Sequence, residues 1–228
     1  MTKPMFITFE GPEGGGKTTQ IELLKVRLWD EAGHKSIVTR EPGGTPFGEN
    51  IRTMLKSVAG ENAPVPRAEL FLFEAARAQH VHQVIAPALA EGVFVLCDRY
   101  TDSTMAYQGH ARQLNLDMGN GTPSRTCVSS LNNLATDGLY PDVTFLLDVD
   151  PAVGLGRSSK RNGKAFDRFD NESLGFHISV REAFLDIAFE NRERIFVIDA
   201  EKAATKVAED IWWVVKKKLD KRDGASQA

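Results

Sequence analysis

Short apolar runs alternate with longer amphipathic stretches along this chain of 228 residues. Five runs are uninterrupted and rich in Val, Ile, Leu or Phe, a pattern typical of parallel strands that are covered on both faces. They span residues 5–10, 36–40, 93–98, 143–148 and 195–199. Helical patterns follow at 18–32, 68–90, 128–137, 151–160, 179–191 and 205–219, and a short helix is expected around Arg52. The alternation predicts an α/β fold, a doubly wound five-stranded parallel sheet with helices on both faces.

Acidic residues gather where the predicted strands end. Glu10, Glu41 and Asp98 stand at the ends of three different apolar runs. In open α/β sheets, ligands bind beyond the carboxyl ends of the strands, and these ends meet at one edge of the sheet. We therefore expect a binding site that contains these three carboxylates.

The first predicted strand runs directly into a glycine-rich turn. Residues 11–18 read G-P-E-G-G-G-K-T, and a helical pattern begins at once. Glycines let several backbone N–H groups point at one anion, and the helix N-terminus adds its positive end. In such a P-loop the lysine, here Lys17, reaches the β- and γ-phosphates, and the next hydroxyl, here Thr18, holds Mg²⁺. The motif predicts a P-loop NTPase-type fold that binds a nucleoside triphosphate. The residues expected to bind it are Gly11, Pro12, Glu13, Gly14, Gly15, Gly16, Lys17, Thr18 and Thr19.

Composition and charge argue against several other classes of protein. The net charge of −3 disfavours a broad basic face for a nucleic-acid polymer. No stretch approaches the roughly 18 apolar residues of a membrane span, and the chain enters its first strand without a signal-peptide pattern. Cys97 and Cys127 lack a metal-binding spacing, which fits a reducing compartment. We expect one cytoplasmic domain over residues 1–228 with a flexible tail at 220–228, no membrane and no nucleic-acid partner.

An Asp-Arg pair ends the third apolar run. Asp98 stands where P-loop folds place a second carboxylate that organises Mg²⁺. Arg99 would face the group that accepts the phosphoryl, unless it is a surface arginine paired with a glutamate. Further arginines at positions 52, 77 and 157 favour transfer from phosphate to phosphate, because the two groups repel each other as they approach. A phosphate acceptor is already ionised near neutral pH, so no general base is needed.

Several segments together resemble the thymidylate kinase family. Beside the P-loop, they are T-R-E-P-G-G-T at 39–45, F-E-A-A-R at 73–77 and D-R-Y-T-D-S-T-M-A-Y-Q-G at 98–109, with shorter matches at 131–132, 140–142 and 147–149. The P-loop is shared by many families, whereas the segments at 39–45 and 98–109 are far more specific. The resemblance runs from Phe6 to about Ala200. It implies transfer of the γ-phosphoryl group of ATP to dTMP, with Mg²⁺ as the cofactor.

The resemblance implies roles at the metal and the phosphates. Asp98 organises Mg²⁺ together with Thr18, and Arg99 holds the acceptor phosphate. Arg52 and Arg77 belong to the pocket for the monophosphate. The catalytic set implied by the resemblance therefore includes Asp98 and Arg99 beside the P-loop lysine.

Other residues are expected around the base and the sugar. By resemblance, Phe73 stacks on the thymine ring, although a phenylalanine there could also be a plain core residue. Thr104 stands where relatives hydrogen-bond the base, and Gln108 lies near the same edge. Tyr107 crowds out a ribose 2′-hydroxyl, which would favour deoxynucleotides.

Glu10 and Glu41 are expected near the sugar hydroxyl and Mg²⁺. The alternative is that these carboxylates pair with Arg52 or Arg99, and the two interpretations can coexist.

A basic segment at about 157–170 is expected to form a lid. The family carries its catalytic arginine either in the P-loop or in the lid, and this P-loop has none, so the chain resembles the bacterial type. Arg157 and Arg161 are both candidates for the catalytic lid residue, and Lys160 stands where another arginine is usual. Without the resemblance, the segment fits a solvated basic loop equally well. Relatives form homodimers, so we expect a homodimer by similarity.

Other interpretations remain open from the sequence. Another nucleotide or nucleoside kinase of the same fold would keep the P-loop, although the arginines favour a monophosphate acceptor. A P-loop GTPase or switch would be expected to carry a guanine-reading N-K-x-D motif, which is absent. A non-catalytic nucleotide-binding protein would be expected to have lost Lys17, Asp98 or Arg99, and all three are present.

Overall fold

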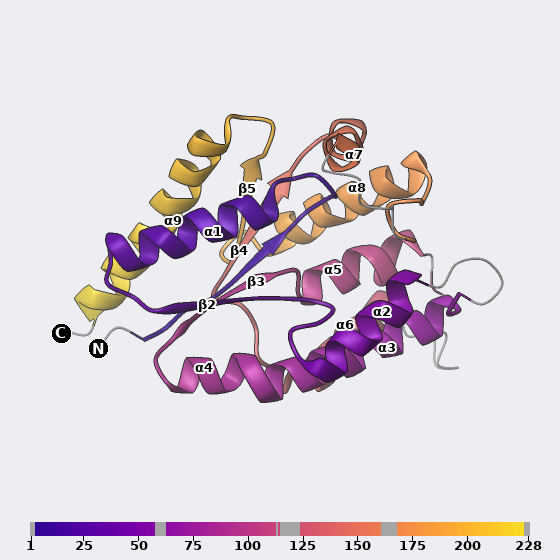
Figure 1. Ribbon diagram of the computed structural model, residues 1–228, viewed down its shortest axis with the longest axis horizontal. Coiled ribbons are helices and arrows are strands. Elements are labelled where there is room, and N and C mark those ends of the chain that lie inside the picture. The colour runs from indigo at the N-terminus through magenta and orange to yellow at the C-terminus, as the bar shows by residue number, and fades with distance from the viewer. Residues whose placement is uncertain (1–2, 58–62, 113, 115–123, 161–167, 226–228) are drawn as a thin grey trace.

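The computed structural model describes residues 3–57, 63–112, 114, 124–160 and 168–225 (Figure 1). In this part of the chain, five parallel strands form one sheet in the order β2-β3-β1-β4-β5. They are β1 (Phe6–Glu10), β2 (Ser36–Arg40), β3 (Phe94–Asp98), β4 (Val143–Asp148) and β5 (Ile195–Asp199). The five predicted strands and the α/β fold are confirmed, and each strand begins and ends within one residue of the predicted position.

Helices cover both faces of the sheet (Figure 1). On one face, α1 (Lys17–Asp30) and α9 (Ala204–Ala225) pack against alternate residues of β1, with Ile7 and Phe9 in the same core as Leu24 and Val215. The other face is covered by α3 (Pro66–His80), η2 (Val81–Ile85), α4 (Ala86–Ala90), α5 (Thr101–Ala106) and α8 (Leu174–Glu190). The remaining helical elements are α2 (Pro46–Ser57), η3 (Tyr107–Ala111), α6 (Ser124–Thr136) and α7 (Pro151–Lys160). Because both faces are covered, most strand positions are apolar.

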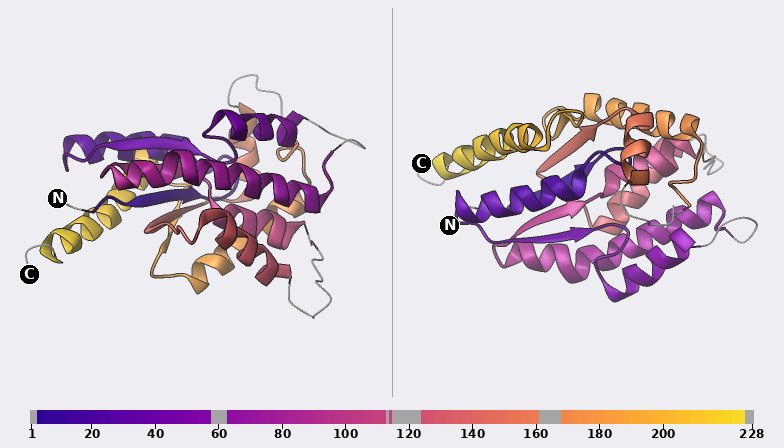
Figure 2. Two further views of the ribbon diagram at one scale, coloured as in Figure 1. Left: turned by 90° about the horizontal axis from the view of Figure 1, so that it is seen from below. Right: turned by 45° about the horizontal axis from the view of Figure 1, so that its top comes forward.

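The strand register brings the expected site residues to one end of the sheet. Asp98 of β3 pairs with Phe9 of β1 on one side and with Arg40 of β2 on the other. The loops that follow these three strands therefore lie next to one another. Figures 1 and 2 show α2 and α7 at this end, opposite the two chain termini.

Two stretches of helix differ in kind from the prediction. The single helix expected at 68–90 is three consecutive elements, α3, η2 and α4, because the backbone widens to π-helical bonding over Val81–Ile85. No helix is predicted at 101–111, yet these residues form α5 and η3. Polar side chains such as Asp102, Thr104 and Gln108 are buried there, which hides the apolar period that would indicate a helix.

Two helices begin earlier than predicted. α6 begins at Ser124 rather than at 128. α8 begins at Leu174 rather than at 179, because Ser173 caps its N-terminus. The Ser173 hydroxyl accepts a hydrogen bond from the backbone N–H of Phe176 at 3.2 Å.

The last helix extends beyond its predicted end at 219. α9 continues to Ala225, through much of the segment that was expected to be a flexible tail. Arg222 donates to the carbonyl oxygens of Lys3 and Pro4 at 2.9 Å each, and to the carboxylate of Asp142 at 2.5 Å. These contacts hold the helix against the start of the chain.

Candidate active site

The P-loop follows β1 and turns back tightly on itself. Gly11 and Gly14 have φ values of 128° and 71°, in the left-handed region that favours glycine. A Cβ atom on Gly14 would lie 2.0 Å from the carbonyl oxygen of Gly154, and one on Gly11 would lie 2.4 Å from that of Leu147. Only glycine combines this backbone with so close an approach. The loop ends where α1 begins, which places the positive end of that helix at the loop.

Lys17, the first residue of α1, lies back over the loop. Its Nζ donates to the carbonyl oxygens of Gly11 at 3.0 Å and Pro12 at 2.9 Å. Burial lowers the pKa of Lys17 and Arg99 adds to this effect, whereas nearby carboxylates oppose it. The ammonium group is thus held at the loop, where a P-loop lysine meets phosphate oxygens.

Thr18 and Asp98 bring two side-chain oxygens together beside the loop. The Thr18 hydroxyl donates to Oδ2 of Asp98 at 3.3 Å, and the two residues lie on α1 and at the end of β3. No group of three or more His, Cys, Asp or Glu side chains with metal-binding geometry occurs among the described residues. One or two protein oxygens fit Mg²⁺, which keeps several waters and takes further ligands from phosphates.

Arg99 turns toward the P-loop. Its φ of 71° is uncommon for a residue with a side chain, and such backbone conformations cluster at functional sites. Nη2 donates to Glu13 at 2.5 Å, Nη1 donates to Ser103 at 3.1 Å, and the guanidinium lies 5.2 Å from the ring centroid of Tyr107. Burial by itself would raise the pKa of Glu13, but Arg99 and Lys17 outweigh it and lower the pKa to about 2. Arg99 therefore pairs with a glutamate, but this glutamate belongs to the P-loop and not to an outer surface.

Glu10 is buried at the end of β1. It accepts hydrogen bonds from the backbone N–H of Tyr100 at 2.7 Å and the hydroxyl of Ser103 at 2.5 Å. Burial and then the charge of Asp102 raise the pKa of Glu10 to about 7, although Arg99 and these hydrogen bonds oppose the rise. The carboxyl group of Glu10 therefore titrates near neutral pH.

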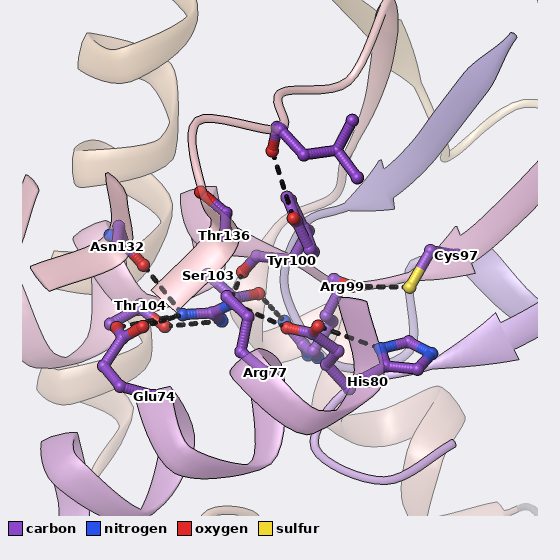
Figure 3. A network of polar contacts seen from close by, with 12 residues as sticks. Glu74, Arg77, His80, Cys97, Arg99, Tyr100, Ser103, Thr104, Asn132 and Thr136 are labelled. Atoms are coloured by element: carbon purple, nitrogen blue, oxygen red, sulfur yellow. Dashed lines mark hydrogen bonds and ion pairs between the residues drawn. The ribbon is translucent and has the colours of Figure 1, made fainter. Parts of the chain in front are cut away.

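The guanidinium of Arg77 is enclosed by protein partners (Figure 3). The residue is 1% exposed and donates from all three nitrogens at distances from 2.7 to 3.2 Å. Its partners are the carboxylates of Glu41 and Glu74, the amide oxygen of Asn132, the hydroxyl of Thr104 and the carbonyl oxygen of Tyr100. A charged group in this position orders its surroundings because each lost contact leaves a buried charge without a partner. Arg77 is therefore positioned to hold Thr104 and Glu41 in place.

Sequence reasoning missed the role of His80. The imidazole is fully buried, with Nε2 at 2.6 Å from the Thr39 hydroxyl and Nδ1 at 3.0 Å from Oε1 of Glu41. Glu41 thus pairs with Arg77 and His80, which the sequence did not indicate. One signal was available, since His80 stands three residues after Arg77 and so shares its helix face.

Most of the expected site residues line one large cavity of about 1020 Å³. P-loop residues 13–18 and Asp98 line one part of it. The residues expected to bind dTMP that also line this cavity are Glu41, Arg52, Phe73, Arg77, Arg99, Thr104, Tyr107 and Gln108. The cavity is not lined by Gly11, Pro12, Thr19 or Glu10, and Glu10 is buried. The ring of Phe73 lies 6.1 Å from that of Phe169, another lining residue that the sequence did not indicate.

The structure describes the basic segment only in part. Arg161 lies outside the described residues. Arg157 is exposed, and its Nη1 donates to the carbonyl oxygen of Ala200 at 2.8 Å. Arg157 does not line the cavity, although its neighbour Ser158 does. The structure therefore does not bring Arg157 to the other predicted site residues.

The fold and the cavity define a class of protein. One cavity is lined both by a P-loop and by buried and half-buried arginines. This arrangement is typical of P-loop phosphotransferases, which must neutralise the charge around a transferring phosphoryl group. Comparison with known proteins identifies the member of this class. The thymidylate kinase family model matches residues 9–211, so the chain belongs to the thymidylate kinase family.

Individual relatives agree with the family match. A thymidylate kinase from Afipia carboxidovorans is 49% identical over 215 residues, which cover 94% of this chain and 90% of the relative. One from Geobacter sulfurreducens is 50% identical over 212 residues, covering 90% of this chain and 94% of the relative. The crystal structure of thymidylate kinase from Ehrlichia chaffeensis superposes with a TM-score of 0.71 at 34% identity, over 93% of this chain and 98% of that one.

These matches confirm the resemblance to thymidylate kinases of bacteria and support a thymidylate kinase over a GTPase switch or a non-catalytic binding protein. The position of the catalytic arginine in the lid stays a prediction. None of the described helices combines the length and the apolar character needed to cross a membrane.

Proposed function

We propose that this protein transfers the γ-phosphoryl group of ATP to dTMP and releases ADP and dTDP. The observation that carries the proposal is that the P-loop, Arg99, Arg52 and Phe73 all line one cavity. Each part supplies one requirement of the reaction, namely a donor site, an acceptor-phosphate site and a base site. Membership of the thymidylate kinase family supports the choice of substrates.

At the donor end, the P-loop backbone and Lys17 bind and orient the phosphates of ATP. Thr18 and Asp98 would hold Mg²⁺, whose charge neutralises the β- and γ-phosphate oxygens when it is bound. The donor–acceptor distance of 3.3 Å between these two side chains supports this assignment, because both oxygens can reach one ion. Glu13 lies beside Lys17 and keeps Arg99 directed toward the loop.

At the acceptor end, Arg99 and Arg52 orient the phosphate of dTMP for in-line attack on the γ-phosphorus. Arg52 donates to the carbonyl oxygen of Pro42 at 2.9 Å, which ties α2 to the loop after β2. The acceptor oxygen of a phosphate is ionised near neutral pH, so the reaction proceeds without a general base. Two like-charged groups must approach each other, and the arginines lower the cost of that approach.

The base would lie between Phe73 and the polar residues of α5 and η3. Phe73 offers an aromatic face for stacking, while Thr104 and Gln108 offer hydrogen bonds to the edge of thymine. Tyr107 would crowd a ribose 2′-hydroxyl and favour a deoxynucleotide. Arg77 would contribute to dTMP binding by holding Thr104, since its own donors are occupied within the protein.

Glu10 and Glu41 would lie near the sugar hydroxyl and the metal. Glu41 lines the cavity, which supports direct contact, whereas Glu10 is buried behind Ser103. Glu10 would then act on the sugar through Ser103 or after a small movement of α5.

We further propose that the protein acts as one domain whose lid, at about 157–170, closes over the donor site and excludes water. Either Arg157 or Arg161 would then reach the transferring phosphoryl group, because the P-loop has no arginine at its variable positions. By similarity to its family, the protein is expected to work in the cytoplasm as a homodimer, with no nucleic-acid or membrane partner. Light scattering of the purified protein would measure the oligomeric state.

A coupled ADP-release assay tests the proposed function. Purified protein with ATP and Mg²⁺ is offered dTMP, dUMP, dCMP, dGMP, AMP and thymidine in separate reactions. Turnover with dTMP far above the others is the expected result. Activity on another acceptor, with none on dTMP, would keep the chemistry and overturn the assignment of the base pocket, and silence with every acceptor would overturn the proposed function.

A further inference from the structure

A fully buried carboxylate stands behind the proposed base pocket. Glu69 of α3 is 0% exposed and is not among the residues that line the cavity. It accepts hydrogen bonds from Nε2 of Gln108 at 2.7 Å, from Nε of Arg112 at 3.2 Å, and from Nη2 of Arg168. Both carboxylate oxygens of Glu69 therefore accept from N–H donors, Oε1 from Gln108 and Arg112 and Oε2 from Arg168.

Glu69 determines which end of the Gln108 amide faces the cavity. The two ends of an amide differ, because the nitrogen only donates and the oxygen only accepts. The Glu69 carboxylate accepts from the nitrogen end, so the oxygen end of Gln108 is turned away from Glu69. Gln108 lines the cavity and is 1% exposed, so this oxygen is the acceptor that it can offer to a ligand.

Thr104, one helical turn before Gln108, offers a hydrogen-bond donor to the cavity instead of an acceptor. Its Oγ1 accepts a hydrogen bond from Nη2 of Arg77 at 2.9 Å, which leaves the hydroxyl proton for donation. The cavity thus presents a donor at Thr104 and an acceptor at Gln108. The edge of thymine carries the matching pair, an accepting O4 and a donating N3–H. Cytosine carries the reverse pair, a donating N4 amine and an accepting N3.

We propose that Glu69 is a positioning residue that selects thymine over cytosine by holding the amide of Gln108 in one orientation. Glu69 touches neither the substrate nor the reacting atoms. Its two oxygens accept from Arg112, Arg168 and Gln108, so the Gln108 amide would lose a hydrogen bond if it turned its oxygen toward Glu69. The inference rests on the proposed function, and it names the feature of the base that this site reads.

The test compares dTMP with 5-methyl-dCMP, which keeps the methyl group and reverses the hydrogen-bonding edge. In Glu69→Gln, the neutral amide at position 69 can donate as well as accept, so Gln108 can turn over. The ratio of kcat/KM for dTMP to that for 5-methyl-dCMP should fall by about tenfold, because one correctly directed hydrogen bond is no longer enforced. The change should fall mainly on the KM for the monophosphate, and the KM for ATP should stay as in the wild type.

Two further variants make the result specific. Gln108→Met removes both ends of the amide and should lower the same ratio, and adding Glu69→Gln to it should lower the ratio no further. Glu172→Gln is the matched control, since Glu172 accepts from Arg112 at 2.5 Å but does not contact Gln108. The ratio in this control should equal that of the wild type.

Each outcome decides the matter. A ratio that stays within about twofold of the wild type in folded Glu69→Gln, or in Gln108→Met, would overturn the proposal, because one hydrogen bond is worth more than that. If Glu69→Gln does not fold, Glu69→Asp keeps the charge for the arginines and withdraws it from Gln108, and an unchanged ratio there would overturn the proposal equally. Absence of dTMP turnover in the wild type would instead refute the proposed function, before any variant is compared.

Discussion

Replacing Glu10 by glutamine is expected to stabilise the protein at alkaline pH and to change its stability little in acid. Glu10 is 1% exposed, and burial followed by the charge of Asp102 raises its pKa from 4.5 to about 7. Between these values the native state holds a proton that the unfolded chain has released. The contribution of Glu10 to the unfolding free energy is therefore fully present below pH 4.5, and it is lost as the pH rises to about 7.

The size of the effect follows from the shift in pKa. One pKa unit corresponds to about 1.4 kcal/mol, so the ionised carboxylate costs the native state about 3 kcal/mol well above neutral pH and about 1 kcal/mol at pH 5. Glutamine at position 10 carries no charge, and its amide oxygen can still accept from the backbone N–H of Tyr100. Any hydrogen bond lost at Ser103 would change stability equally at both pH values. The difference in unfolding free energy between Glu10→Gln and the wild type should therefore be about 2–3 kcal/mol more favourable at pH 8 than at pH 5.

Urea denaturation at pH 5 and pH 8 measures this difference. Glu13→Gln is the matched control, because Arg99 and Lys17 hold the pKa of Glu13 at about 2 against the effect of burial. Glu13 stabilises the native state above its ordinary pKa and loses that contribution only as the pH falls toward 2, so its variant should differ from the wild type by the same amount at pH 5 and pH 8. An equal difference at both pH values for Glu10→Gln would refute the reasoning.

Four other predictions concern the reaction. Arg99→Ala should lower kcat/KM for dTMP by about 10²–10³-fold while ATP affinity, measured by titration, changes little, and unchanged turnover would remove Arg99 from the site. Gly14→Ala places a methyl group 2.0 Å from the carbonyl oxygen of Gly154, so the rise of Tm on adding ATP should be lost, and a normal rise would contradict the described loop. In steady-state kinetics dUMP should be a poorer substrate than dTMP but not an excluded one, since one methyl group is worth about 1–3 kcal/mol, and equal turnover at low concentration would count against an apolar methyl pocket. Of Arg157→Ala and Arg161→Ala, one should lower kcat by about 100-fold or more and the other should have little effect, and small effects in both would reject a lid arginine.

The strands and the P-loop could be predicted from the sequence because their causes are local. A buried parallel strand needs an unbroken apolar run, and the runs ending at Glu10, Asp98 and Asp148 met that condition. Helix ends were less accurate, because a cap such as Ser173 outweighs the periodicity that follows it. The helix over 101–111 was missed, since its polar residues are buried by other elements rather than exposed to water.

The sequence by itself determined the sheet, the phosphate-binding loop and the family, since apolar periodicity and short motifs encode contacts between residues close in the chain. Only the tertiary structure decided how the charged residues pair. Arg77 reaches Glu41, 36 residues earlier, and Asn132, 55 residues later, while Glu69 reaches Arg168, 99 residues away. In the sequence, each of these charged side chains has several oppositely charged residues with which it could pair. The packing of α3 against the neighbouring helices brought particular ones within hydrogen-bond distance and excluded the water that would otherwise have solvated them.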